Sequence, residues 1–424
     1  MRLHRMRGFA LCVALAALLA ACGGQNAAPS PTATPAEAPT AAEAPTAAEA
    51  PTATPAEVSP TAEPAASALL PRALYLIKAG QIVRLEADGV TETAITAEEP
   101  FAPDIAAVAD FAVSPADGSL AYIVQRESTP LLVRTGPDGQ DRTPLYDNAE
   151  VMVSGPVFSP DGQFVAVRLT GEADFVNGLS LIPSAGGEPR LLVADDDLPE
   201  PESLGFGHSP ERFSPDGTRL LVNRFALSVE QCDLAVVTLA DGAVVPLQAP
   251  EPAEDERATT CGTGSWAPDG SAVYFAPERI GAAPGAVGIW RADPATGDSF
   301  PITPQPDSPP FTLYAAPEVV ADGTLLAFVA QVDALPIPFE PLPAPLAYTM
   351  ATVDLASGLS AELRAAVNGS PFQVLWAPDG SGAVTALSPE AGEPALFWLP
   401  AGDGEPALLL GSTADLFSYR WAAR

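Results

Sequence analysis

The sequence predicts an all-β fold, a single β-propeller formed by residues 71–424. The pentapeptide Phe-Ser-Pro-Asp-Gly occurs at residues 158–162 and again at 213–217, and looser copies recur with Asp-Gly pairs about 44 to 57 residues apart. That period is typical of four-stranded propeller blades rather than of helical solenoids. No long apolar pattern with a 3.6-residue period occurs in this region, so helices are expected to be minor.

The first 21 residues predict a lipoprotein signal peptide. Three arginines precede an uncharged run, residues 8–21, that is too short to span a bilayer as a helix. The run ends in Leu-Ala-Ala-Cys-Gly, which resembles the bacterial lipobox, and the resemblance implies cleavage before Cys22 and acylation of its new N-terminus. An ordinary secretory signal with a chance cysteine is the alternative. Two or more acyl chains would hold the protein stably on a membrane, so we expect an extracytoplasmic protein, lipid-anchored to the bacterial cell membrane or envelope.

Residues 22–70 predict a disordered tether after the lipidated cysteine. This segment consists almost entirely of Ala, Pro, Thr and Glu, has no aromatic residue and repeats the hexapeptide Ala-Glu-Ala-Pro-Thr-Ala. Such a composition cannot bury a core and favours an extended chain. The tether would hold the folded domain away from the membrane.

The charge balance argues against nucleic acid as a partner. The whole chain carries a formal net charge of -33, and loss of the three signal arginines makes the mature protein more acidic still. Nucleic-acid binding needs clustered Lys and Arg to neutralise phosphates. An acidic surface more often serves solubility than cation binding, and a monomer is expected.

Two cysteines are predicted to form a disulfide. Cys12 lies in the signal peptide and Cys22 is the lipidation site, which leaves Cys232 and Cys261. An extracytoplasmic compartment oxidises thiols, so these two are expected to pair, with free buried cysteines as the alternative.

The repeated pentapeptide predicts a tight hairpin turn. Ser, Pro, Asp and Gly suit a type I turn followed by a left-handed residue, with Gly where φ must be positive. The Asp and Gly residues of these turns are therefore structural rather than catalytic: Asp161, Gly162, Asp216, Gly217, Asp269, Gly270, Asp379 and Gly380. The copy Val-Ala-Asp-Gly at residues 320–323 lacks the Pro, which puts its turn geometry in doubt.

Seven blades are predicted, closed by both ends of the domain. Six copies of the hairpin give six blades, while residues 73–96 supply three strands without a first strand before them. The C-terminal segment 417–423 resembles that missing first strand. Joining the two would complete a seventh blade and remove the open edge of the ring; six blades is the alternative.

The recurring Phe/Trp-Ser/Ala-Pro-Asp-Gly followed by an apolar strand resembles the WD40-like repeat of TolB-type propellers, over residues 73–424. The resemblance implies the fold but not the function, because such repeats occur both in periplasmic scaffolds and in propellers attached to peptidases. The aromatic residues at the equivalent first-strand positions are expected to pack between blades.

The sequence offers no catalytic or metal-binding motif that stands out, and no cofactor is expected. The mature chain has one histidine, His208, and no Gly-x-Ser-x-Gly segment, which argues against a peptidase. We expect a loop or capping role for His208, with ligand contact as the alternative. The run Asp195, Asp196 and Asp197 offers oxygen ligands to Ca²⁺ but lacks the spacing of a calcium loop, so a solvated acidic loop is favoured.

The longest segments are predicted to share one face of the ring, opposite the Pro-Asp-Gly turns. Long variable loops on a rigid scaffold commonly carry binding. The sequence therefore favours a non-catalytic scaffold that binds a protein or small-molecule ligand on this face, with Asp195–Asp197 and His208 as candidate ligand residues. The alternative is a carbohydrate-active or other hydrolytic enzyme that uses carboxylates at the central channel.

Overall fold

A computed structural model describes residues 68–102, 105–172, 175–195, 205–227, 232–247, 262–277, 288–304, 308–334, 346–368, 370–388, 394–412 and 418–423. The chain from Ser67 to Arg424 forms one compact unit. All regular structure in the described ranges is β-strand. These ranges contain no helix of the length and apolar character needed to cross a membrane.

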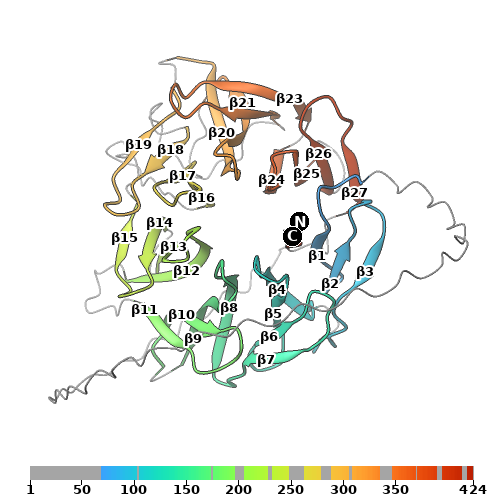
Figure 1. Cartoon of the computed structure of the whole chain (residues 1–424), viewed down its shortest axis with the longest axis vertical. Helices are drawn as coiled ribbons and strands as arrows, with labels where there is room; N and C mark the ends of the chain where they lie inside the picture. Colours follow the sequence, from blue (N-terminus) through green and yellow to red (C-terminus); the bar gives the residue numbers. More distant parts are fainter. Residues whose placement is uncertain are drawn as a thin grey trace, which may run out of the picture. The chain divides into compact units, whose positions relative to one another are not determined.

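Seven four-stranded antiparallel sheets surround a central axis (Figure 1). We number them as blades in chain order, starting with the blade that contains β1. Blade 1 has β28 (Tyr419–Trp421), β1 (Leu74–Lys78), β2 (Gln81–Leu85) and β3 (Glu92–Ala94); blade 2 has β4 (Val108–Val113), β5 (Leu120–Val124), β6 (Leu131–Thr135) and β7 (Thr143–Tyr146); blade 3 has β8 (Val151–Phe158), β9 (Phe164–Gly171), β10 (Gly178–Pro183) and β11 (Arg190–Ala194).

The remaining blades follow the same order from the axis outward. Blade 4 has β12 (Phe206–Phe213), β13 (Arg219–Ala226), β14 (Cys232–Thr238) and β15 (Val244–Pro246); blade 5 has β16 (Gly264–Trp266), β17 (Val273–Phe275), β18 (Trp290–Ala292) and β19 (Ser299–Pro301); blade 6 has β20 (Phe311–Val319), β21 (Leu325–Val332), β22 (Ala347–Val353) and β23 (Ser360–Asn368); blade 7 has β24 (Ser370–Trp376), β25 (Gly382–Ser388), β26 (Ala395–Pro400) and β27 (Ala407–Leu410).

The prediction of a seven-bladed propeller is confirmed, including its closure by both ends of the domain. The C-terminal strand β28 is the innermost strand of blade 1 and pairs with β1, so that Leu74 lies opposite Trp421 and Leu76 opposite Tyr419. The alternative of six blades is excluded. Pairing between the two ends leaves no open sheet in the ring.

The Pro-Asp-Gly turns share one geometry and lie on one face of the ring, which we call the turn face. The glycines at 162, 217, 270 and 380 have φ between 69° and 72°, the left-handed region that favours glycine. Each preceding Asp accepts the backbone N–H two residues further on, at 2.9 to 3.1 Å. The Val-Ala-Asp-Gly turn has the same contacts, with Gly323 N–H donating to the Val320 carbonyl and Thr324 N–H to Asp322, so its missing Pro leaves the turn geometry unchanged.

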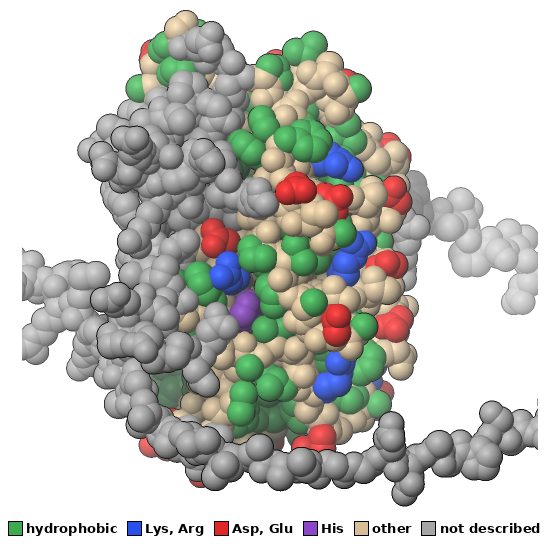
Figure 2. Space-filling model, turned by 90° about the vertical axis from the view of Figure 1, so that its left-hand side faces the viewer, with side chains coloured by type: hydrophobic (Ala, Val, Ile, Leu, Met, Phe, Trp, Pro, Cys, Tyr) green, Lys and Arg blue, Asp and Glu red, His purple; other side chains and the backbone are tan. Residues whose placement is uncertain are grey.

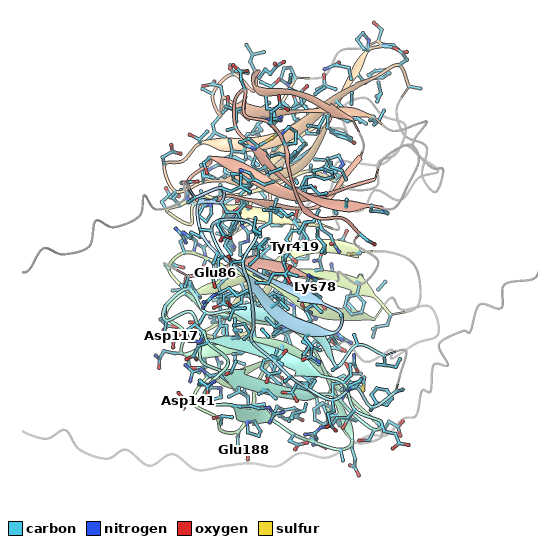
Figure 3. All side chains as sticks on the ribbon, turned by 90° about the vertical axis from the view of Figure 1, so that its right-hand side faces the viewer. Lys78, Glu86, Asp117, Asp141, Glu188 and Tyr419 are labelled. Carbon is cyan, nitrogen blue, oxygen red and sulfur yellow. The ribbon has the colours of Figure 1, made fainter. Side chains whose placement is uncertain are left out.

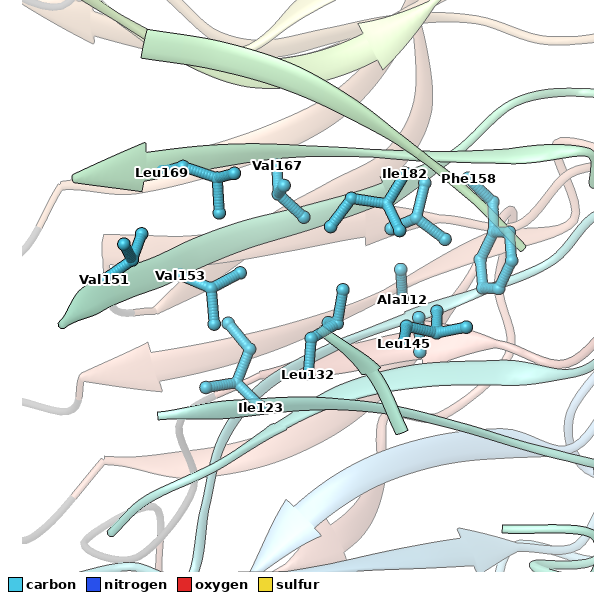
Figure 4. Close-up of a cluster of buried hydrophobic side chains, with 12 residues drawn as sticks. Ala112, Ile123, Leu132, Leu145, Val151, Val153, Phe158, Val167, Leu169 and Ile182 are labelled. Atoms are coloured by element: carbon cyan, nitrogen blue, oxygen red, sulfur yellow. The ribbon is translucent and has the colours of Figure 1, made fainter. Parts of the chain in front are cut away.

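Apolar side chains fill the interfaces between blades. Between blades 2 and 3, Ile123, Leu132 and Leu145 face Val153 and Val167 across a buried layer (Figure 4). Burial of each such side chain contributes about 1.5–3 kcal/mol relative to exposure. The seven blades are therefore held side by side mainly by apolar packing.

Aromatic residues at the ends of the innermost strands pack between blades, as the sequence predicts. Phe158 is buried between blades 2 and 3, and Phe213 between blades 3 and 4. The indole N–H of Trp266 donates to the carbonyl of Arg212 at 3.3 Å, and that of Trp376 donates to the carbonyl of Ala316 at 2.8 Å. These tryptophans thus tie each blade to the one before it in the chain.

Candidate functional site

The predicted ligand residues that the structure describes lie on blades 3 and 4, near the face opposite the turns. We call it the long-loop face because the connections between second and third strands and between blades lie there. Asp195 follows β11, and His208 lies within β12 rather than in a loop. Asp196, Asp197, Cys22 and Cys261 lie outside the described residues.

Asp195 is held by a buried ion pair with Arg168 of β9. Arg168 donates from Nη1 to Oδ1 at 2.9 Å and from Nη2 to Oδ2 at 2.6 Å, the two-pronged geometry that suits a guanidinium and a carboxylate. The side chains are only 11% and 8% exposed. Removing one partner of such a pair leaves a buried charge without compensation, so Asp195 fixes the point where the connection to blade 4 begins.

Gly207 makes room for this ion pair. A Cβ on Gly207 would lie 2.5 Å from Nη1 of Arg168 and 2.7 Å from Cζ of Phe225. The guanidinium of Arg168 also lies over the Phe225 ring, 4.7 Å from its centroid. Arg168, Gly207 and Phe225 were not recognised from the sequence; the two glycines of Gly-Phe-Gly-His at residues 205–208 were the available signal.

A second arginine, Arg224, lies in blade 4 and has weaker polar contacts. The strand register places His208, Arg224 and Asp233 side by side across β12, β13 and β14. The Arg224 guanidinium lies over the Phe206 ring at 3.5 Å and its Nη1 is 3.9 Å from the Asp233 carboxylate. Among the described residues it has no hydrogen bond, although guanidinium N–H groups normally find acceptors. Arg224 is 21% exposed, whereas His208 is 3% exposed.

Asn223 connects the start of β14 with the segment that leads into blade 5. The Cys232 Sγ lies 3.9 Å from the Asn223 Oδ1, and the backbone N–H of Gly262 donates to the same oxygen at 3.3 Å. Gly262 directly follows Cys261 in the sequence. The contact therefore brings the chain next to Cys261 close to Cys232.

Two arginines on the innermost strands interact with carboxylates of other innermost strands. Arg212 of β12 donates to Glu318 of β20 at 2.6 Å, and the Glu318 charge raises the pKa of Arg212. Near β28, burial raises the pKa of the Asp110 carboxyl, although Arg420, the Phe111 N–H and the Ser418 hydroxyl each act to lower it.

The turn face carries carboxylates that are already used in their own turns. Hydrogen bonds from the Ser159 and Ser214 side chains lower the pKa values of Asp161 and Asp216, which therefore remain ionised. Figure 3 shows Asp117 and Asp141 along one edge of the ring and Lys78 nearer the other. On the flank in Figure 2, acidic and basic side chains are interspersed.

No group of three or more His, Cys, Asp or Glu side chains in the described ranges could hold a metal ion.

Comparison with known proteins gives the fold. No protein-family model and no curated protein matches the chain. Among solved structures, an oligogalacturonate lyase from Vibrio parahaemolyticus is 12% identical over 80% of this chain and 86% of its own, with a TM-score of 0.53. TolB from Acinetobacter baumannii is 17% identical over 81% of this chain and 79% of its own, with a TM-score of 0.38.

A puromycin hydrolase is also similar. It is 18% identical over 79% of this chain, with a TM-score of 0.51, and this chain spans 51% of its length. At such identities the likeness shows a common fold alone. A lyase and a hydrolase share this fold, so function has to be argued from the site.

Proposed function

We propose that this protein is an extracytoplasmic, lipid-anchored propeller that binds a protein or small-molecule ligand through its long-loop face and performs no catalysis. The observation that supports it is the position of Arg224. Its guanidinium is partly exposed and stacked on Phe206, and it forms no hydrogen bond with the residues that the structure describes. An arginine on an aromatic ring is a common anchor in binding interfaces.

The difference in structure between the turn face and the long-loop face supports the same proposal. On the turn face, the Pro-Asp-Gly aspartates accept hydrogen bonds from their own turns. On the long-loop face, β11 ends at Ala194 and β12 begins at Phe206, while β15 ends at Pro246 and β16 begins at Gly264. Long connections fixed to a rigid scaffold, such as the one that the Arg168 pair anchors, are suited to recognition.

Anchoring would keep this face available outside the cytoplasm. The proposed signal (1–21) and the tether with its acylated Cys22 (22–70) would attach residues 71–424 to the membrane as a monomer. The Cys232–Cys261 disulfide would hold the connection between blades 4 and 5.

The test compares two single-site variants of the soluble domain, residues 67–424, as baits for envelope extract. Arg224→Ala removes the proposed anchor, whereas Asp161→Asn changes the turn face and can still accept hydrogen bonds. We expect a ligand retained by the wild type to lose at least tenfold in affinity for Arg224→Ala and to bind Asp161→Asn normally, as measured by calorimetry. Equal affinity of all three proteins would contradict the assignment of the binding face.

A hydrolytic enzyme is the second candidate function. The observation that favours it is the raised pKa of the Asp110 carboxyl. A carboxyl whose pKa is raised by burial suits a general acid. Turnover of oligosaccharide or ester substrates by the wild type, abolished in Asp110→Asn, would favour this reading over the scaffold.

A further inference from the structure

Blade 5 differs from the other blades in the length of its strands. Its four strands, β16 to β19, have three residues each, whereas the innermost strands of the flanking blades, β12 and β20, have eight and nine. Each strand residue contributes ladder hydrogen bonds and cross-strand contacts. The described part of blade 5 therefore has the fewest internal contacts with which to resist local opening.

The ion pair between Arg212 and Glu318 joins the two blades that flank blade 5. Arg212 belongs to blade 4 and Glu318 to blade 6, 106 residues apart in sequence, yet Nη1 and Oε1 are 2.6 Å apart. Each residue immediately precedes the last residue of its innermost strand, and Ser265 occupies the same position in blade 5. The pair thus connects the two neighbours of blade 5 directly.

Ser265 and Trp266 join blade 5 to the two strands that carry the ion pair. It is 1% exposed, and its hydroxyl oxygen accepts the backbone N–H of Val319 at 2.8 Å. On the other side, Trp266 donates to the Arg212 carbonyl. Blade 5 is therefore joined by one hydrogen bond to each strand that carries the ion pair.

We infer that Arg212 and Glu318 form a latch that keeps blade 5 closed, and that blade 5 opens as a local unit when the latch is broken. The two side chains are 40% and 26% exposed, so dissolved ions reach them. Their attraction is accordingly sensitive to salt.

Hydrogen exchange measured by mass spectrometry on the purified mature protein tests the latch. Glu318→Gln keeps the size of the side chain and removes its charge. We expect exchange in the peptides covering β16 to β19 to become about tenfold faster, while peptides from blade 2 keep their wild-type rates. The double variant Arg212→Gln/Glu318→Gln should match the single variant, because the pair acts as one unit.

Arg134→Gln is the matched control. Arg134 and Asp117 form an ion pair at 2.9 Å within blade 2 alone, so its loss should leave blade 5 exchange unchanged. If Glu318→Gln fails to fold, salt provides the second measurement: 1 M NaCl should accelerate exchange in blade 5 of the wild type more than in blade 2. Acceleration that is equal in all blades, or absent from blade 5, would overturn the inference.

Discussion

The indole N–H of Trp421 donates to the backbone oxygen of Trp376 at 2.7 Å. This hydrogen bond joins the C-terminal strand of blade 1 to blade 7. Trp398 packs edge-on against Trp421, with ring centroids 6.1 Å apart, and the Tyr419 hydroxyl donates to the Gln373 carbonyl. Strand β28 is thus bound both to its own blade and to the last blade of the ring.

Deleting residues 417–424 should therefore open the ring and destabilise the whole domain. The loss of two large packed aromatic residues alone is expected to cost at least about 3 kcal/mol. Trp421→Phe, which keeps most of the packing but cannot donate, should cost about 1 kcal/mol. Thermal unfolding followed by circular dichroism would measure both effects. A truncated protein that melts at the wild-type temperature would contradict closure by this strand.

The number of blades was predictable because its signals are local. A Pro-Asp-Gly turn needs only its own residues, as the contacts of Asp161 with Gln163 and Ser159 show, and its recurrence counts the blades. The closing strand was predictable because residues 417–423 repeat the first-strand pattern. Repetition within a single sequence is therefore enough to predict the architecture.

The side-chain pairs of the site were not predictable in this way. Arg168 meets Asp195 only after β9 and the end of β11 are brought together in blade 3, and Arg212 meets Glu318 only after blades 4 and 6 lie on either side of blade 5. Non-repeating positions carry no periodic signal, so neither pair could be chosen among the 53 acidic and 20 basic residues. His208 was expected to have a loop or capping role between two blades, whereas it lies in β12, opposite Arg224.

Gly207→Ala should disrupt the buried ion pair of Arg168 and Asp195. The new Cβ would lie 2.5 Å from Nη1 of Arg168, so the guanidinium must move and the buried Asp195 carboxylate would lose hydrogen bonds. We expect a loss of about 2–4 kcal/mol in the free energy of unfolding, measured by urea denaturation. Gly411→Ala is the control, because nothing lies within 4 Å of its added Cβ. Equal stability of the two variants would show that the site can relax around the methyl group.

Asp117 should stabilise the folded protein at pH values above its unfolded pKa and lose this effect at lower pH. Burial acts to raise its pKa, but hydrogen bonds from Ser114 and Ser119 and the charge of Arg134 bring it down to about 2. A pKa lowered in the folded state stabilises the protein above the unfolded value of about 3.8, and this stabilisation is lost as pH falls toward 2. Since Asp117 is 53% exposed, the contribution should be about 1 kcal/mol.

The comparison for Asp117 uses Asp117→Asn in urea titrations at pH 2, 3, 4 and 6. The free energy difference between wild type and variant should shrink as the pH falls from 4 to 2. A difference that stays constant across this range would mean that the carboxylate charge has no role.

Cys22→Ser should release the protein from membranes or prevent its processing. The lipobox-like segment ending at Cys22 predicts acyl chains on that residue, and several chains are needed for stable attachment. Detergent-phase partitioning of the protein expressed in a bacterial host measures the change, with Cys12→Ser, within the signal, as the control. Unchanged partitioning of Cys22→Ser would eliminate lipid anchoring at this residue.

Cys232 and Cys261 should be joined by a disulfide in the exported protein. The Asn223 side chain contacts Cys232 and also Gly262, the residue after Cys261, so the two parts of the chain meet at one side chain. In the chain-entropy model, closing a loop of about 30 residues contributes about 3.6 kcal/mol, less any strain. Intact-mass analysis after alkylation without reduction should find no adduct on the mature domain, and two adducts after reduction. Because the bond would hold the connection into blade 5, Cys232→Ser/Cys261→Ser should also accelerate hydrogen exchange at β16, and two adducts on the unreduced protein would reject the pairing.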